Sequence, residues 1–151
     1  MLILCTILGM AGPSLKGFFA MRRIEDTAAR IVALAKYAKS QAVCEGRTYR
    51  LNFDLINKTY WLTVQDKGAF RELEMNLGRI FMLPGDVRME VSDLTSDGVI
   101  RYAQFNPSGR ITPGTLLLTG PRGDQLHIMC RSATESYVVV DEKEVRYEAG
   151  L

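Results

Sequence analysis

The stretch IEDTAARIVALAKYAKSQAVCEGRTYRLNFDL, residues 24–55, changes its hydrophobic period part-way along. Before Gly46 the apolar residues recur at steps of three and four, which predicts a single stripe along one helix. That stripe consists of Ile24, Ala28, Ile31, Leu34, Ala35, Ala38 and Ala42. After Gly46 the period is two, since polar residues alternate with Tyr49, Leu51, Phe53 and Leu55. The stretch therefore predicts a helix that Gly46 ends, followed at once by a strand.

Alanine is the commonest residue in the stripe. Small side chains let another surface approach the helix backbone closely, as happens when a sheet lies along a helix. Charged residues such as Arg30, Lys36 and Lys39 lie off the stripe and are expected to face solvent. We therefore expect this helix to pack its stripe against a β-sheet.

The chain before this helix is apolar, and residues 1–12 carry no charged side chain. No glycine or proline lies between Gly17 and Gly46, so one long helix is predicted from the N-terminus to about residue 45. Pro13 removes a backbone donor, which predicts a kink or local melting there. A secretory signal peptide is not indicated, because no basic residue precedes the apolar run.

The apolar run at the N-terminus is shorter than a membrane span. A span needs about 20 apolar residues, and this run supplies about half of that. Lys16 could snorkel, and the two phenylalanines would suit a membrane interface. We interpret the run as the second half of a membrane or filament-core helix, made of Leu2, Ile3, Leu4, Ile7, Leu8, Gly9, Ala11, Gly12, Pro13, Phe18 and Phe19. A buried core helix is the alternative, because runs of about 10 to 14 apolar residues are often that.

After Gly46, strand patterns alternate with turn signals such as Pro84-Gly85 and Asp97-Gly98. Ile56-Asn57-Lys58 separates two alternating segments, residues 48–55 and 59–66, which predicts a β-hairpin. Further strands are predicted at 70–75, 87–91, 99–105, 115–119, 125–131 and 137–140, with 144–147 as an additional candidate.

These elements predict the α+β class, with one long N-terminal helix, about residues 1–45, packed on an antiparallel β-sheet body. We divide the chain into an apolar helix half, residues 1–21, and a globular domain, residues 22–151. A chain of 151 residues is long enough for one such domain with a core of its own. Its net charge of +2 produces no strong field that would attract nucleic acid or an acidic partner.

Three sets of polar residues could carry chemistry, and for each we favour a simpler interpretation. His127 lies in an alternating strand pattern, with no nucleophile and orienting acid beside it. Asp93 and Asp97 could bind a cation, but they lack the ligand series of a calcium loop and fit a solvated turn better. The third set consists of arginines that would bind nucleic acid only if the fold brings them onto one face: Arg47, Arg50, Arg110, Arg122 and Arg131. Aspartate and glutamate residues interleaved with them favour a surface of mixed charge instead.

The cysteines, Cys5, Cys44 and Cys130, are far apart in the sequence and form no CxxC motif. With the single histidine they do not make a metal site. If the body lies outside the cytoplasm, Cys44 and Cys130 could form a disulfide that joins the helix to the sheet. Two independent buried thiols are an equally good interpretation.

The order of these features resembles the type IV pilin-like proteins, in which one long N-terminal helix precedes a β body. Residues 12–54, GPSLKGFFAMRRIEDTAARIVALAKYAKSQAVCEGRTYRLNFD, resemble the helix and first strand of minor pseudopilin H of type II secretion and of its pilus relative FimT. Those relatives share an ARSxAixxgxxxxl segment, which residues 38–43 and Gly46 match. Residues 105–118, FNPSGRITPGTLLL, resemble their F.p.Gr..p.tl.l hairpin, so the resemblance covers nearly the whole chain.

The resemblance implies a structural subunit with no catalytic residue, no metal and no cofactor. Under it, the protein is a minor pseudopilin that assembles into, or initiates, the pseudopilus of a type II secretion system. It implies a single-pass helix in the bacterial inner membrane and a domain in the periplasm. The implied partners are other pseudopilins or pilins, the inner membrane and the inner-membrane assembly platform. The alternative is a FimT-like minor pilin for pilus assembly or DNA uptake, with nucleic acid as a further partner.

The resemblance also bears on the first residues of the chain. Members of this family begin with a basic leader that ends in glycine, followed by phenylalanine and an apolar run containing glutamate. Residues 1–12 contain no such segment. We therefore expect the DNA upstream of Met1 to encode this leader in frame. A stop codon directly upstream would instead indicate a leaderless variant.

Overall fold

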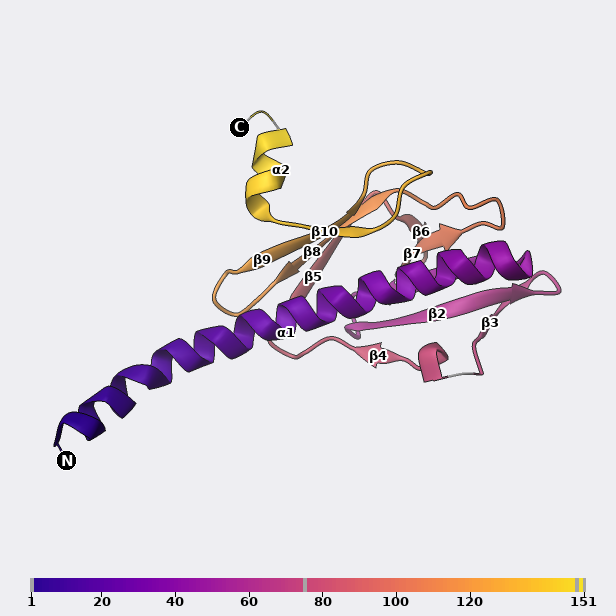
Figure 1. The fold of residues 1–151 in the computed structure, drawn as a ribbon. Coiled ribbons are helices and arrows are strands. Elements are labelled where there is room, and N and C mark those ends of the chain that lie inside the picture. The colour runs from indigo at the N-terminus through magenta and orange to yellow at the C-terminus, as the bar shows by residue number, and fades with distance from the viewer. Residues whose placement is uncertain (1, 75, 149, 151) are drawn as a thin grey trace.

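The computed structural model describes the backbone of residues 2–74, 76–148 and 150, and the side chains of residues 19–74, 76–141, 143–146 and 150. A long helix, α1 (Leu2–Glu45), lies along two antiparallel β-sheets (Figure 1). The first sheet has the order β3-β2-β1-β7-β6, and β4 also pairs with β2. Its strands are β1 (Tyr49–Asp54), β2 (Thr59–Asp66), β3 (Ala69–Glu72), β4 (Phe81–Met82), β6 (Thr95–Asp97) and β7 (Ile100–Phe105). The second sheet has the order β10-β9-β8-β5 and consists of β5 (Arg88–Ser92), β8 (Gly114–Thr119), β9 (Gln125–Cys130) and β10 (Val138–Val140).

The apolar stripe of α1 packs against both sheets. All of its residues are buried, and Ile24, Ile31 and Ala38 are each 0% exposed. They belong to one core cluster with Leu51 of β1 and Leu118 of β8. Because α1 contacts strands of the first sheet and strands of the second, the helix connects the cores of the two sheets.

The helix ends where the sequence predicts. Gly46 follows the last helical residue with a φ of 66°, a left-handed conformation that glycine adopts without a steric penalty. The backbone remains helical through Pro13, so the local melting expected at this proline is not found. A proline removes one helical hydrogen bond, and the turns on either side still form theirs.

The predicted hairpin is present as β1 and β2, which pair antiparallel up to Asp54 and Thr59. The Asp54 carboxylate closes the turn by accepting hydrogen bonds from the backbone amides of Ile56 and Asn57, each at 3.0 Å. The hydrogen bonds from the Asn57 amide and the Asn57 side chain lower the pKa of Asp54 below its usual range, because they stabilise the charged form.

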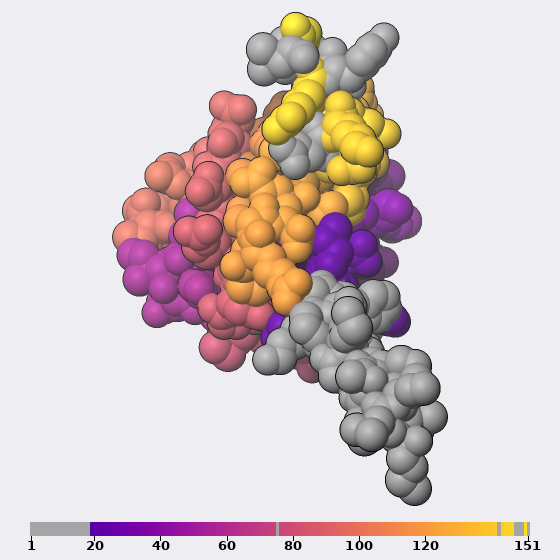
Figure 2. Space-filling view, turned by 90° about the vertical axis from the view of Figure 1, so that its left-hand side faces the viewer, coloured from indigo at the N-terminus to yellow at the C-terminus, as the bar shows by residue number. Residues whose placement is uncertain are grey.

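A glycine lets the second sheet approach α1 closely. The turn after β8 begins at Gly120, and a Cβ at this position would be 2.5 Å from the Cδ1 atom of Ile24. In the space-filling view, the orange atoms of the β8–β9 region lie directly against the indigo atoms of α1 (Figure 2). The absence of a side chain at Gly120 therefore permits this contact.

The end of the chain differs from the prediction. Residues 144–147, a candidate strand, are part of a short helix, α2 (Glu142–Glu148). The amides of Glu144 and Val145 donate to the Asp141 carbonyl, which starts the helical turn. Glutamate, lysine and arginine make up most of the segment, and all of them favour helix over strand.

Two strands have no counterpart in the prediction, and one predicted strand is too long. β3 ends at Glu72 rather than at residue 75, and a short 3₁₀ helix, η1 (Asn76–Gly78), follows it. β4 has 2 residues and β6 has 3, which is too short for an alternating pattern to be visible in the sequence.

Candidate assembly surface

α1 leaves the β body near Ala20. Ala20 is 4% exposed, whereas Phe19 is 57% exposed. On the N-terminal side of this point the helix projects beyond both sheets (Figure 1). The predicted anchor side chains from Leu2 to Phe18 lie outside the residues whose side chains are described. In the part of the chain that is described, no helix is long and apolar enough to cross a membrane.

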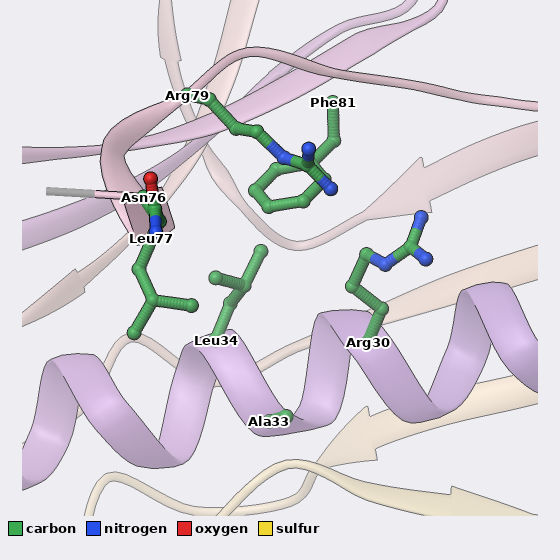
Figure 3. A pocket seen from close by; sticks show the side chains of 7 residues that line it. All are labelled: Arg30, Ala33, Leu34, Asn76, Leu77, Arg79 and Phe81. Carbon is green, nitrogen blue, oxygen red and sulfur yellow. The ribbon is translucent and has the colours of Figure 1, made fainter.

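A groove of about 580 Å³ runs between α1 and the segment that contains η1 and β4 (Figure 3). The apolar side chains of Leu34, Leu77 and Phe81 form part of its wall. The guanidinium groups of Arg30, from α1, and Arg79, from the opposite segment, extend into the same space (Figure 3). The groove is therefore apolar within and positively charged on two sides.

Both arginines stack on the ring of Phe81. The Cζ atom of Arg79 lies 4.7 Å from the ring centroid, and the Cζ atom of Arg30 lies 5.4 Å from it. These distances are typical of cation–π contacts. Among the described residues, neither arginine has a carboxylate within salt-bridge distance. The groove residues themselves include no aspartate or glutamate.

The aromatic stack continues into the core. The rings of Phe81 and Tyr60 are nearly parallel, with centroids 5.4 Å apart. Tyr60 is 0% exposed, and its hydroxyl makes no hydrogen bond of good geometry within the described structure. Burial raises the pKa of Tyr60, and the Arg30 side chain opposes this rise because it approaches the hydroxyl closely enough to interact with it and is positively charged. Phe81 is thus held from behind by Tyr60 and faces the arginines in front.

Next to the groove lies a group of exposed apolar side chains that we call the η1–β4 patch. It consists of Leu77, Ile80 and Met82, which are 39%, 53% and 71% exposed. Gly78 shapes this segment, because a Cβ there would collide with the carbonyl and side chain of Leu73. No sequence signal predicts the groove, since its walls come from segments more than 40 residues apart.

Comparison with known proteins assigns the chain to a family. A protein-family model described as type II transport protein GspH matches residues 27–140, from within the α1 stripe to the end of β10. This chain belongs to the GspH family. No curated protein matches it.

Solved structures confirm the pilin-like α+β fold of this GspH-family chain. A structure of the minor pseudopilin EpsH from the type 2 secretion system of Vibrio cholerae has a TM-score of 0.62 at 11% identity, and covers 81% of this chain and 96% of that one. A second crystal structure of EpsH has a TM-score of 0.66 at 9% identity, with coverages of 80% and 94%. The type IV minor pilin FimU of Pseudomonas aeruginosa has a TM-score of 0.56 at 15% identity, with coverages of 83% and 92%. The family and these neighbours together support a minor pseudopilin or minor pilin role.

The disulfide considered from the sequence is not formed in this GspH-family chain, because Cys44 and Cys130 are both free. Cys44 is exposed near the end of α1 and so lies off the buried stripe. Cys130 is 3% exposed, and its thiol donates to the Ser132 carbonyl at 3.2 Å. The two side chains therefore face solvent and core, so of the two alternatives considered from the sequence, the buried thiol is found for Cys130 but not for Cys44.

The other polar residues named from the sequence do not form a site. His127 is a half-buried residue of β9, paired with Leu117 on one side and Val140 on the other. Asp93 follows β5 with a φ of 64°, and Asp97 is an exposed residue of β6. Among the described residues, no group of histidine, cysteine or carboxylate side chains could hold a metal ion.

The arginines named as a nucleic-acid face do not all lie together on the GspH-family domain. Arg50 is held between the rings of Phe70 and Tyr102, with its Cζ atom 3.7 Å and 4.1 Å from their centroids. Arg110 is next to Gly109, which lies near Val43 at the end of α1, whereas Arg122 follows the Gly120 contact with Ile24. Since those helix positions are about 28 Å apart at 1.5 Å per residue, Arg110 and Arg122 lie toward opposite ends of the domain.

Proposed function

We propose that this chain is a structural minor pseudopilin of a type II secretion system, which assembles into or initiates the periplasmic pseudopilus. The observation that carries the proposal is the helix α1, whose C-terminal half completes the domain core while its N-terminal half projects from it. The match to the type II transport protein GspH family favours secretion over other filament systems. No covalent chemistry is needed for this role.

The helix provides a physical route into a filament. Before assembly, residues 1–21, as the second half of the expected single-pass membrane helix, anchor the chain in the inner membrane, and residues 22–151 lie in the periplasm. On assembly, the same segment packs with the helices of other pseudopilins. This exchange costs little, because lipid and a helical filament core are both apolar, and small residues such as Gly9, Ala11 and Gly12 favour close helix contact. The inner-membrane assembly platform is the expected site of the exchange.

The test is complementation of a strain that lacks the gene. We expect the full chain to restore export of the secretion substrates to the medium. A chain without Met1 to Phe19 should be released from the membrane fraction and should fail to restore export. Normal export in the strain without the gene would contradict the type II secretion role.

The alternative is a minor pilin of a type IV pilus, with nucleic acid as a partner if it acts in DNA uptake. The likeness to FimU supports this alternative, although its TM-score of 0.56 is below the 0.62 and 0.66 of the EpsH structures. The same strain separates the two functions. Loss of surface pili or of transformation, with export intact, would identify the pilus role.

A further inference from the structure

We propose that the groove between α1 and the η1–β4 segment binds an acidic segment of a neighbouring filament subunit. In this complex a carboxylate of the neighbour lies between Arg30 and Arg79, and an apolar side chain beside it packs on Leu77 and Phe81. The inference rests on the proposed function, because it names the surface through which this subunit recognises the next one.

The charge of the groove defines what it can bind. Arg30 and Arg79 face the same space from opposite walls, and the described residues give neither of them a carboxylate partner (Figure 3). Both guanidinium groups lie over Phe81, so stacking orients them, and no carboxylate of the described residues occupies either one. Two positioned guanidinium groups suit a carboxylate, which accepts paired hydrogen bonds from the arginine fork.

The apolar part of the surface indicates a protein partner. The η1–β4 patch has three large exposed apolar side chains within six residues of the chain, and one of them, Leu77, lines the groove together with the two arginines. Clustered apolar side chains on a domain surface mark contact sites, and arginine is enriched at the centre of protein interfaces. A carboxylate next to an apolar side chain on the neighbour would complement this combination.

The groove is preformed, since its outer wall is fixed at several points. β4 pairs with β2 through Thr59 and Met82, and the Leu83 amide donates to the Lys58 carbonyl at 2.9 Å. Beyond β4, Asp86 forms an ion pair of 2.9 Å with Arg23 of α1. A wall tied to the sheet, with a surface ion pair to the helix, limits the movement of the segment that carries Arg79, which reduces the entropy cost of binding.

Nucleic acid and anionic lipid fit this surface less well. Both bind through many phosphate contacts along a broad basic surface, whereas this groove offers two arginines beside exposed apolar side chains. The net charge of +2 adds no long-range attraction for a polyanion. A protein segment is therefore the occupant that the surface favours.

The test is site-specific photo-crosslinking of the full chain in the bacterium that produces it. A photoreactive residue replaces Leu77 in the groove or, as a control, Val139 on β10, which lies on the other side of α1 (Figure 1). The two positions are matched in exposure, at 39% and 44%. We expect the Leu77 position to crosslink to a pilin-like subunit, at a peptide that contains aspartate or glutamate, and the Val139 position not to form this product.

Charge reversal shows whether the arginines hold the partner. We expect Arg79→Glu to reduce the Leu77 crosslink about five- to tenfold, since an attractive contact becomes repulsive. Arg79→Lys should retain part of it, and Arg110→Glu, an exposed arginine outside the groove, should leave it unchanged. Changing the acidic residue of the crosslinked peptide to lysine should restore the product in the Arg79→Glu chain.

Several results would overturn the proposal. They are no product at Leu77, the same product at both positions, a product with lipid or nucleic acid, or a yield that Arg79→Glu does not change. Failure of the proposed function is distinguishable, because it appears as normal export in the strain without the gene. If that strain loses export while Arg79→Glu restores export and crosslinking in full, the secretion role stands and the groove proposal is wrong.

Discussion

The stripe of α1 offers a test of how the helix divides its tasks. Ile31 is 0% exposed and lies in the middle of the stripe, within the core cluster that joins α1 to both sheets. Ile31→Asp should unfold or strongly destabilise the domain. Ala29→Asp is the matched control, because it adds the same carboxyl two residues away on the exposed side of the helix.

The magnitude follows from the burial of Ile31. Removing a buried isoleucine side chain costs about 2–5 kcal/mol. Burying a carboxyl group without a partner adds about 1–3 kcal/mol even when it is protonated. The sum, about 3–8 kcal/mol, is comparable to the whole stability of a domain, about 5–15 kcal/mol. The control should cost about 1–2 kcal/mol, from up to about 0.7 kcal/mol of helix propensity plus a few tenths for each of the like charges of Glu25 and Asp26 one turn earlier.

The pH dependence gives a second measurement of the same variant. Burial raises the pKa of the introduced carboxyl in the folded state above its unfolded value of about 3.9. The folded state then holds the proton more tightly, so stability falls as the pH rises above this value. We expect Ile31→Asp to be less destabilised near pH 3 than at pH 7, relative to Ala29→Asp.

The assay is thermal unfolding, followed by circular dichroism, of the chain without Met1 to Phe19. This truncated chain should be folded, because burial in the body begins at Ala20. Its Tm should fall by about 10 °C or more with Ile31→Asp, or the protein should be unfolded, and it should change by only a few degrees with Ala29→Asp. An unfolded parent, or equal Tm values for the two variants, would refute the division of α1 into a projecting half and a core-forming half.

Three further variants test local features. Gly120→Ala forces a Cβ to within 2.5 Å of the Ile24 side chain and should lower the free energy of unfolding by about 1–3 kcal/mol in urea titrations. The control, Gly85→Ala, should be neutral, because no atom lies within 4 Å of the added carbon. Equal effects of the two variants would contradict the packing argument. In Gly78→Ala the added Cβ collides with Leu73 and must displace η1, so the yield of the Leu77 crosslink should fall while the chain stays in the membrane fraction. An unchanged crosslink yield would count against a preformed groove. The folded-state pKa of Asp54 is lowered, so the stability that its carboxylate contributes is present above the unfolded pKa and is lost as the pH falls through the folded pKa. Asp54→Asn should therefore reduce the difference in urea midpoint between pH 7 and pH 3. An unchanged difference would be inconsistent with this role.

The core of the fold could be predicted from the sequence because periodicity reports burial directly. The stripe residues recur at helical spacing, and the structure buries all of them. The switch to a period of two after Gly46 predicted the β1–β2 hairpin, and that hairpin is present. Short elements lack this information, which is why β4, β6 and α2 were missed or misassigned.

Features that depend on contacts distant in sequence were not predictable in the same way. The sequence left open whether Cys44 and Cys130 pair, because sequence spacing does not tell which way a side chain faces at the end of a helix. The groove was missed for a related reason. Arg30 is an exposed helix residue and Arg79 follows a 3₁₀ turn, and only the folding of β4 onto β2 brings them to one ring. The anchor role of residues 1–21 stays a prediction.

The position of Leu34 connects the core of the domain with its candidate binding surface. Leu34 is 2% exposed and belongs to the buried stripe, yet it also forms part of the groove wall. Arg30, one helical turn earlier, holds one side of the groove, and Ala33 leaves room beside it. The same turns of α1 thus complete the core and present the groove. A segment bound there would pack directly on the core, so its binding should also stabilise the folded domain, because it binds the native state alone. A subunit built in this way would gain stability as it enters the filament.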